Sequence, residues 1–350
     1  MFEGLKLTVS DWFAGLRERI GSAGNWFRSL MIGFVVLTIV LIGIGFYMDV
    51  KPERFEVYRT ALKRAGDDPD RLVIGYVSTA TLAHVAETLL DKNGGYLSND
   101  ITPPSVFMDN MPNWEYGVIV QMRDLARVLR NDWSRSQSQS LEDQDLAKAD
   151  PLFHFDHLSW MLPPTEREYR KAIKALDRYL FRLSDPAEPD AQFYARADNL
   201  REWLAIVEKR LGGISQQLSA SVGQLRVNTD LSGERRARQA TTAPAEILVK
   251  TPWLKIDDVF FEARGATWAL IHFFEAVEID FADVLEDKNA LVSLRQIRRE
   301  LEASQQPVRS PMILNGGGFG MFPNHSLVMA SYISRANAAV IDLRQLLERG

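Results

Sequence analysis

The first 48 residues contain two hydrophobic patterns with different periods. In residues 2–20, apolar side chains recur every three or four positions, which places them along one face of a helix. In residues 29–48 the pattern is continuous: 20 uncharged residues, of which twelve are Leu, Ile, Val or Phe. A helix of that length crosses a hydrocarbon core about 30 Å thick. We therefore expect a transmembrane anchor at 29–48, preceded by an amphipathic interfacial helix in residues 1–28.

The apolar run at 29–48 has three possible interpretations. Its twelve strongly apolar residues favour membrane insertion by about 4–7 kcal/mol, and no charge or proline interrupts them. A cleaved signal usually has a shorter apolar region followed by small residues, a pattern that Gly43-Ile44-Gly45 matches only loosely. Aliphatic residues on every face, so near the terminus, disfavour a buried core helix. We interpret the run as a retained anchor. Together with the segment before it, the anchor is expected to contact lipid through Trp12, Trp26, Phe27, Leu30, Phe34, Leu37, Leu41, Phe46 and Tyr47.

The rest of the chain predicts an all-α fold, in which the single transmembrane helix is followed by a mostly helical bundle domain. Residues 49–70 form a juxtamembrane segment. Helical periodicity runs through residues 71–225 and returns in residues 253–350, so we expect the bundle to have two halves. Between them, in residues 226–252, periodicity gives way to Gly, Pro and a run of Arg, which predicts an exposed connection.

The clearest helix pair lies in the first half of the bundle. Apolar residues recur at steps of three and four in residues 165–183 and again in residues 193–211, with a short proline-containing segment between them. This arrangement predicts an antiparallel αα-hairpin. Thr165 and Glu168 have the spacing of a capping box at the start of the first helix. Strand-like composition is confined to two short runs, 71–77 and 246–250.

Composition limits the classes of function and the cellular compartments that fit this chain. The chain has 41 Lys and Arg against 46 Asp and Glu, so it lacks the basic surface of a nucleic-acid-binding protein, and we expect no nucleic-acid partner. Cysteine is absent, which excludes cysteine catalysis and agrees with an oxidising compartment. Long domains translocate largely regardless of flanking charge. We therefore expect a cytoplasmic N-terminus and a periplasmic C-terminal domain.

His154, Asp156 and His157 are the densest group of potential metal ligands. On a helix, the two histidines share a face, whereas Asp156 projects elsewhere. A complete site needs further ligands from distant sequence, and none stands out. Structural or capping roles are the preferred explanation of these residues, so we expect no metal and no cofactor and keep the three as candidates only.

Residues 259–285 form a helix with apolar residues around most of its circumference, which predicts a central, buried position. Glu262 and Glu275 on this helix are candidate catalytic carboxylates, since burial shifts a carboxyl pKa towards the range of acid–base work. Arg264 and His272 are candidate ligand-binding residues. An internal ion-pair network explains the same polar residues without any chemistry, because buried charges are costly unless paired.

Three stretches of the chain resemble one known family: LLDKNGGYLSND at 89–100, MDNMPNWEYG at 108–117 and RADNLREWL at 196–204. The chain resembles the Gram-negative membrane protein family catalogued as domain of unknown function 2333. The resemblance extends over nearly the whole chain, including the anchor, and it implies an inner-membrane location. It supplies no established activity and no catalytic residues.

These observations predict a single-pass inner-membrane protein whose periplasmic helical domain acts as a scaffold or interaction module in an envelope assembly. The expected partners are the lipid bilayer and an envelope protein of unknown identity. A non-enzymatic role is preferred because no recognisable catalytic motif is present. Two alternatives stay open: an envelope hydrolase that uses Glu262 and Glu275, and a lipid- or small-molecule-binding module with an aromatic pocket between helices.

Overall fold

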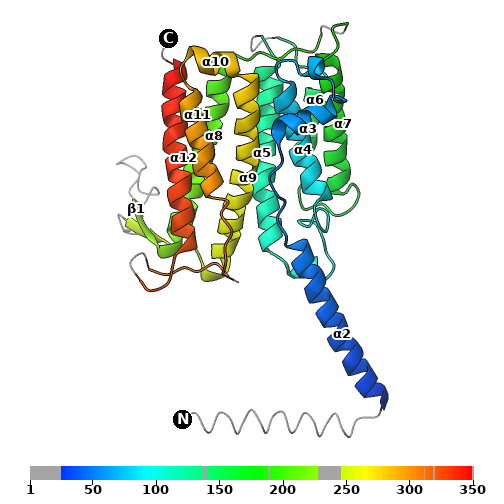
Figure 1. Cartoon of the computed structure of the whole chain (residues 1–350). Helices are drawn as coiled ribbons and strands as arrows, with labels where there is room; N and C mark the ends of the chain where they lie inside the picture. The colour runs from blue at the N-terminus through cyan, green and yellow to red at the C-terminus, as the bar shows by residue number, and fades with distance from the viewer. Residues whose placement is uncertain are drawn as a thin grey trace, which may run out of the picture.

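One long apolar helix, α2 (Asn25–Met48), extends away from all the other helices in the computed structural model (Figure 1). The structure describes residues 25–136, 140–187, 190–227, 246–310, 312–317 and 320–348. Within these ranges, α2 is the one helix long and apolar enough to cross a membrane, with a mean hydropathy of 2.6. No residue in its most apolar stretch is buried. Such a surface is unfavourable in water, so the geometry agrees with the predicted span.

The predicted anchor side chains within α2 are exposed, apart from Leu41, which is partly buried. Trp26 and Phe27 begin the helix, and Phe46 and Tyr47 end it, so aromatic rings lie at both ends of the apolar stretch. Trp12 and nearly all of the predicted interfacial helix at 1–28 lie outside the described residues.

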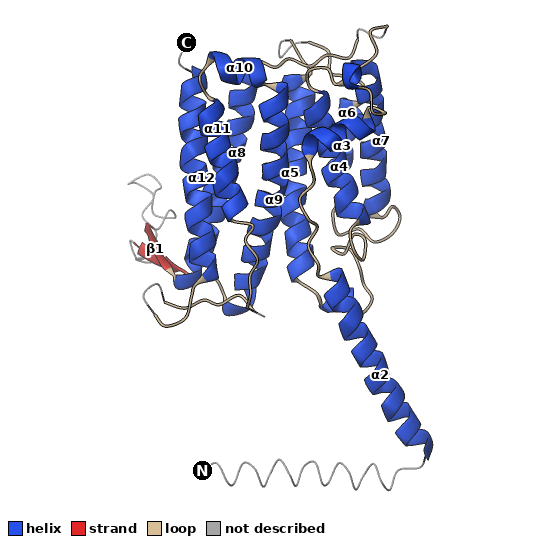
Figure 2. Cartoon of the chain, in the orientation of Figure 1, coloured by secondary structure: helices blue, strands red, loops and turns tan. Residues whose placement is uncertain are grey.

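The other helices form a bundle whose long members run alternately towards α2 and away from it (Figures 1 and 2). This arrangement confirms the expected all-α class. The helices are α3 (Val57–Arg64), α4 (Tyr76–Asp91), α5 (Asn110–Val128), α6 (Leu146–Phe153), α7 (Thr165–Leu183), α8 (Ala197–Ser219), α9 (Ile256–Asp280), α10 (Ala282–Asp287), α11 (Leu291–Ala303) and α12 (His325–Glu348). A π-helical turn, η3 (Leu129–Trp133), continues α5. Short 3₁₀ turns are η1 (Pro69–Arg71), η2 (Ser105–Phe107), η4 (Ala220–Val222) and η6 (Trp253–Lys255).

The base of the bundle is the end nearest α2, where the α4–α5, α6–α7, α8–α9 and α11–α12 connections lie (Figure 1). Part of the α8–α9 connection is an antiparallel hairpin of β1 (Gln224–Val227) and β2 (Glu246–Val249), in which Leu225 pairs with Leu248. The strand-like run at 246–250 is thus confirmed. Residues 228–245, within the expected exposed connection, lie outside the described ranges.

Helix α9 occupies the centre of the bundle and crosses α5 at van der Waals distance between backbones. A methyl group at Gly265 would lie 1.9 Å from the carbonyl oxygen of Trp114. A methyl group at Gly117 would lie 2.0 Å from the carbonyl oxygen of Glu262. Because only glycine permits this approach, α5 and α9 are in direct backbone contact at the crossing. Trp114 and Trp268 fill the space beside the crossing, with ring centroids 5.2 Å apart.

The predicted hairpin of residues 165–183 with 193–211 is wrong. Helix α7 packs against α4 and α6, whereas α8 packs mainly against α12 on the far side of the bundle (Figure 1). The α7–α8 connection crosses η3, where Phe193 packs against Trp133 and Phe281. Periodicity correctly gave both helices but could not say which apolar stripe each one faces.

Two local predictions also fail for identifiable reasons. Thr165 does not form a capping box, because its hydroxyl donates to the carbonyl oxygens of Asp156 and Ser159. The strand-like run at 71–77 instead leads into α4. There the Asp280 carboxylate, at the end of α9, accepts a 2.6 Å hydrogen bond from the Ser78 amide and caps the helix across the bundle.

Candidate functional site

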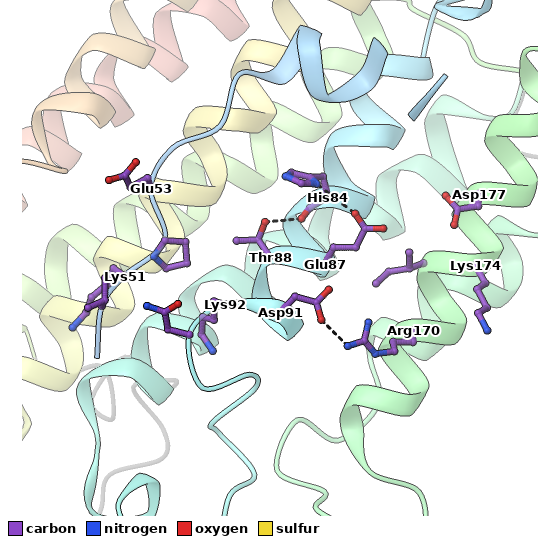
Figure 3. Close-up of a pocket in the computed structure, with 14 residues that line it drawn as sticks. Lys51, Glu53, His84, Glu87, Thr88, Asp91, Lys92, Arg170, Lys174 and Asp177 are labelled. Carbon is purple, nitrogen blue, oxygen red and sulfur yellow. Dashed lines mark hydrogen bonds and ion pairs between the residues drawn. The ribbon is translucent and has the colours of Figure 1, made fainter. Parts of the chain in front are cut away.

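An open groove of about 730 Å³ lies between α4 and α7, bordered by the segment that leaves α2 (Figure 3). Ile173 contributes apolar surface, while the remaining lining is rich in charge of both signs. The charged and titratable lining residues come from three separate parts of the chain: Lys51, Glu53, His84, Glu87, Asp91, Lys92, Arg170, Lys174 and Asp177. The groove is therefore a product of the tertiary fold, and no local motif encodes it.

Most charges in the α4–α7 groove are already paired within the chain. Arg64 bridges Glu87 and Asp177, with nitrogen–oxygen distances of 2.8 Å to each. Burial alone would raise the pKa of Glu87, but hydrogen bonds from His84 and Arg64 outweigh it and lower that pKa to about 2. The side chains of Glu53 and Lys174, by contrast, make no hydrogen bond or ion pair with any described residue, which leaves one charge of each sign available to a partner.

A second groove, of about 680 Å³, lies between α5, α8 and α9 and contains Glu262. Burial raises the pKa of Glu262, although Arg210 acts in the opposite direction. Arg210 itself holds Asp124 through two hydrogen bonds of 2.6 and 3.0 Å. Beside them, Gln121 is 2% exposed, and its amide nitrogen has no hydrogen-bond partner. A buried donor without a partner costs about 1–3 kcal/mol, so this groove holds unused hydrogen-bonding capacity.

Glu275 does not share a site with Glu262. The two residues are 13 positions apart on α9, about 20 Å along the helix axis, and face in different directions. Burial also raises the pKa of Glu275, with Arg298 acting in the opposite direction at 4.0 Å. A pair of catalytic carboxylates in a glycosidase lies within about 10 Å, so these two residues do not form such a pair.

Arg264 and His272 both hold distant segments of the chain against α9. The Arg264 guanidinium donates to the carbonyl oxygens of Gln305 and Gln306, each at 2.9 Å. The His272 Nε2 atom accepts a 3.2 Å hydrogen bond from the Phe55 amide, while Nδ1 donates to the Trp268 carbonyl oxygen at 2.8 Å. Burial lowers the pKa of His272 to about 3, so the ring is neutral. Both arrangements are structural.

The Phe55 ring also stacks on the His272 ring at 4.0 Å. Nearer to α2, the Lys51 ammonium lies 4.3 Å from the centre of the Phe261 ring. The segment between α2 and α3 is therefore attached to α9 at two points, each involving a side chain of this central helix.

The three candidate metal ligands do not converge. His154 pairs with Asp150 at 2.9 Å, whereas the His157 ring packs against Tyr116 and lies 4.0 Å from the Asp156 carboxylate. Asp156 accepts a hydrogen bond from the Leu158 amide. Among the described residues, no group of three His, Cys, Asp or Glu side chains is arranged to hold a metal ion.

Glu115, which is not among the predicted site residues, is fully buried at the base of the bundle. Its carboxylate accepts hydrogen bonds of 2.8 Å from the Leu97 and Ser98 amides, and it forms an ion pair with buried Lys92. These contacts join the stretch at 89–100 to the stretch at 108–117. A usable signal was present, because Glu115 occupies a core-facing position of α5, in line with Met111, Val118 and Met122.

Comparison with known proteins gives a family and no activity. A family model described as an uncharacterized protein conserved in bacteria matches residues 21–350, nearly the full chain. Comparison with curated proteins gives no match, and neither does comparison with solved structures.

Proposed function

We propose that this chain, which belongs to the uncharacterized bacterial family DUF2333, is a membrane-anchored interaction module. In this proposal α2 spans the inner membrane once, the bundle lies in the periplasm, and a partner protein of the cell envelope binds in the α4–α7 groove. The observation that carries the proposal is the position of this groove directly beside the segment that leaves α2 (Figure 3).

The chemistry of the α4–α7 groove supports a protein partner. Its paired charges give it a defined shape, while Glu53 and Lys174 remain free to form ion pairs across an interface. Mixed charge around apolar surface, here from Ile173 and Val50, is typical of the rim and centre of a protein–protein contact. An open groove of this kind suits a polypeptide segment better than an enclosed small molecule.

A photo-crosslinking amino acid at Lys174 tests the groove in living cells. We expect a specific crosslinked partner from position 174 and none from Arg299, an exposed residue of α11 used as the matched control. Reversing the free charge with Lys174→Glu should abolish co-purification of that partner, whereas Arg299→Glu should leave it unchanged. Equal crosslinking from both positions, or a partner indifferent to Lys174→Glu, would remove the groove from the proposal.

The proposed orientation has a separate test. Alkaline phosphatase fused after Gly350 should be active, because the bundle would deliver it to the periplasm, and a β-galactosidase fusion at the same position should be inactive. The reverse pattern would place the bundle in the cytoplasm.

Small-molecule binding in the α5–α8–α9 groove is a second candidate, favoured by the unpartnered amide nitrogen of Gln121. A polar ligand with a hydrogen-bond acceptor would satisfy this group. Native mass spectrometry of the full chain should then detect a co-purifying small molecule. Gln121→Leu should lose it, whereas Gln296→Leu on the surface of α11 should retain it. A wild-type chain of unmodified mass would exclude this candidate.

A further inference from the structure

Exposed apolar side chains gather in two loops at the base of the bundle. Phe107 and Leu162 are among the most exposed large apolar residues described, at 82% and 86%. Val106 in the α4–α5 connection and Trp160 and Met161 in the α6–α7 connection are also exposed. Exposure of such groups to water is unfavourable, and no residue that the structure describes covers them.

The two loops are joined to each other by hydrogen bonds. The Tyr96 hydroxyl donates to the His157 carbonyl oxygen, and the Asn99 side-chain amide donates to the Ser159 carbonyl oxygen, both at 2.8 Å. Buried Glu115 fixes the beginning of the first loop through the Leu97 and Ser98 amides. The apolar tips are therefore held by ordered backbone close to them.

The α4–α5 connection also adjoins the end of α2. A methyl group at Gly45 would lie 3.8 Å from Cβ of Pro104, and one at Gly94 would overlap the side chain of Met48. Gly45 precedes the end of α2 by three residues, so Pro104 lies level with the last turn of the helix, about 4–5 Å below its end. Val106 and Phe107 follow within the same short loop.

We propose that these two loops are a second membrane contact, which seats the base of the bundle in the outer part of the bilayer beside the anchor. This inference rests on the proposed function in one respect, namely that α2 spans the membrane. Aromatic and aliphatic side chains at this level bury their apolar surface at the boundary between headgroups and acyl chains. Neither loop, 97–109 or 154–164, contains Lys or Arg to pair with an anionic headgroup, so the contact depends on the apolar side chains and requires no anionic lipid.

The absence of cysteine from the chain makes the test direct, because every introduced cysteine is unique. Phe107→Cys and Leu162→Cys carry an environment-sensitive NBD fluorophore in the full-length protein, reconstituted in phosphatidylcholine nanodiscs with or without nitroxide-labelled lipid. Leu141→Cys is the matched control, since Leu141 is 95% exposed and lies between η3 and α6, at the end of the bundle away from α2. Ile39→Cys, in the middle of α2, reports on the anchor itself.

We expect blue-shifted emission and strong nitroxide quenching at positions 107 and 162, as at position 39, and neither effect at position 141. Added phosphatidylglycerol should leave the quenching unchanged. Quenching at 39, with 107 and 162 behaving like 141, would overturn the second contact and keep the anchor. Absence of quenching at 39 would overturn the anchor and the inference together.

Discussion

The crossing of α5 and α9 predicts that a methyl group added at Gly265 will destabilise the fold, although Gly→Ala inside a helix normally stabilises it. In a helix interior, Gly→Ala usually gains about 1 kcal/mol from helix propensity. At Gly265 the new Cβ would lie 1.9 Å from the Trp114 carbonyl oxygen, well inside any real contact distance. The helices must separate by more than an ångström, which costs about 1–3 kcal/mol or more in overpacking.

Gly213 in α8 supplies the matched control, because a methyl group there meets nothing within 4 Å. We expect Gly265→Ala to lose about 2 kcal/mol and Gly213→Ala to gain about 1 kcal/mol, a separation of about 3 kcal/mol. Circular dichroism of the full chain in detergent should show the first variant unfolding several degrees below wild type and the second slightly above it.

The double variant sharpens this test. Gly117 approaches the Glu262 carbonyl oxygen at the same crossing, so once Gly265→Ala has separated the helices, Gly117→Ala should cost less than it does alone. If Gly265→Ala unfolds at or above the temperature of Gly213→Ala, the backbone contact between α5 and α9 does not exist as described.

The remaining predictions concern three buried titratable groups, each followed by urea unfolding of the full chain. Folding lowers the pKa of His272 from 6.5 to about 3, so between these two pH values the unfolded chain binds more protons than the folded chain. The free energy of unfolding therefore falls as the pH drops from 6.5 to about 3, by at most about 1.4 kcal/mol per pH unit. His272→Gln should remove that part of the acid sensitivity, and an unchanged profile would contradict the assignment. Burial raises the pKa of Asp280 from 3.8 to about 6, so the folded chain holds the proton more tightly than the unfolded chain. Wild type should therefore lose stability relative to Asp280→Asn as the pH rises from 3.8 to about 6. Asp280→Ala also removes the acceptor for the Ser78 amide and should cost about 1–2 kcal/mol, a loss that Asp280→Asn should not show. Glu115→Gln leaves Lys92 buried without its counter-charge and should cost about 3–5 kcal/mol, and wild-type stability would refute the buried pair.

Periodicity and composition predicted the helices well because these signals are local. The apolar run at 29–48 and the stripes in α7, α8 and α12 depend only on spacing, and the structure has helices at each. Helix partners could not be predicted in the same way. The stripe of α8 packs on α12, and nothing in its spacing distinguishes α12 from α7 as a partner.

The candidate sites were predicted less well, since they depend on distant contacts. Glu262 was identified as a buried carboxylate, but its neighbours Gln121 and Arg210 come from two other helices. His272 was predicted as a candidate ligand-binding residue, whereas its hydrogen-bond donor, the Phe55 amide, lies 217 positions earlier. No spacing rule connects residues so far apart, and only the tertiary fold reveals that His272 has a structural role.

The attachment of segment 49–56 to α9 makes the connection between α2 and the bundle rigid. With Lys51 over Phe261 and Phe55 against His272, the chain between α2 and α3 is held against the bundle and is not a loose tether. Tilting or rotating α2 would therefore act first on α9, the central helix of the bundle. If α2 spans the membrane as proposed, the bundle is held at one distance from the bilayer and in one orientation, so it presents the same side to every neighbouring protein.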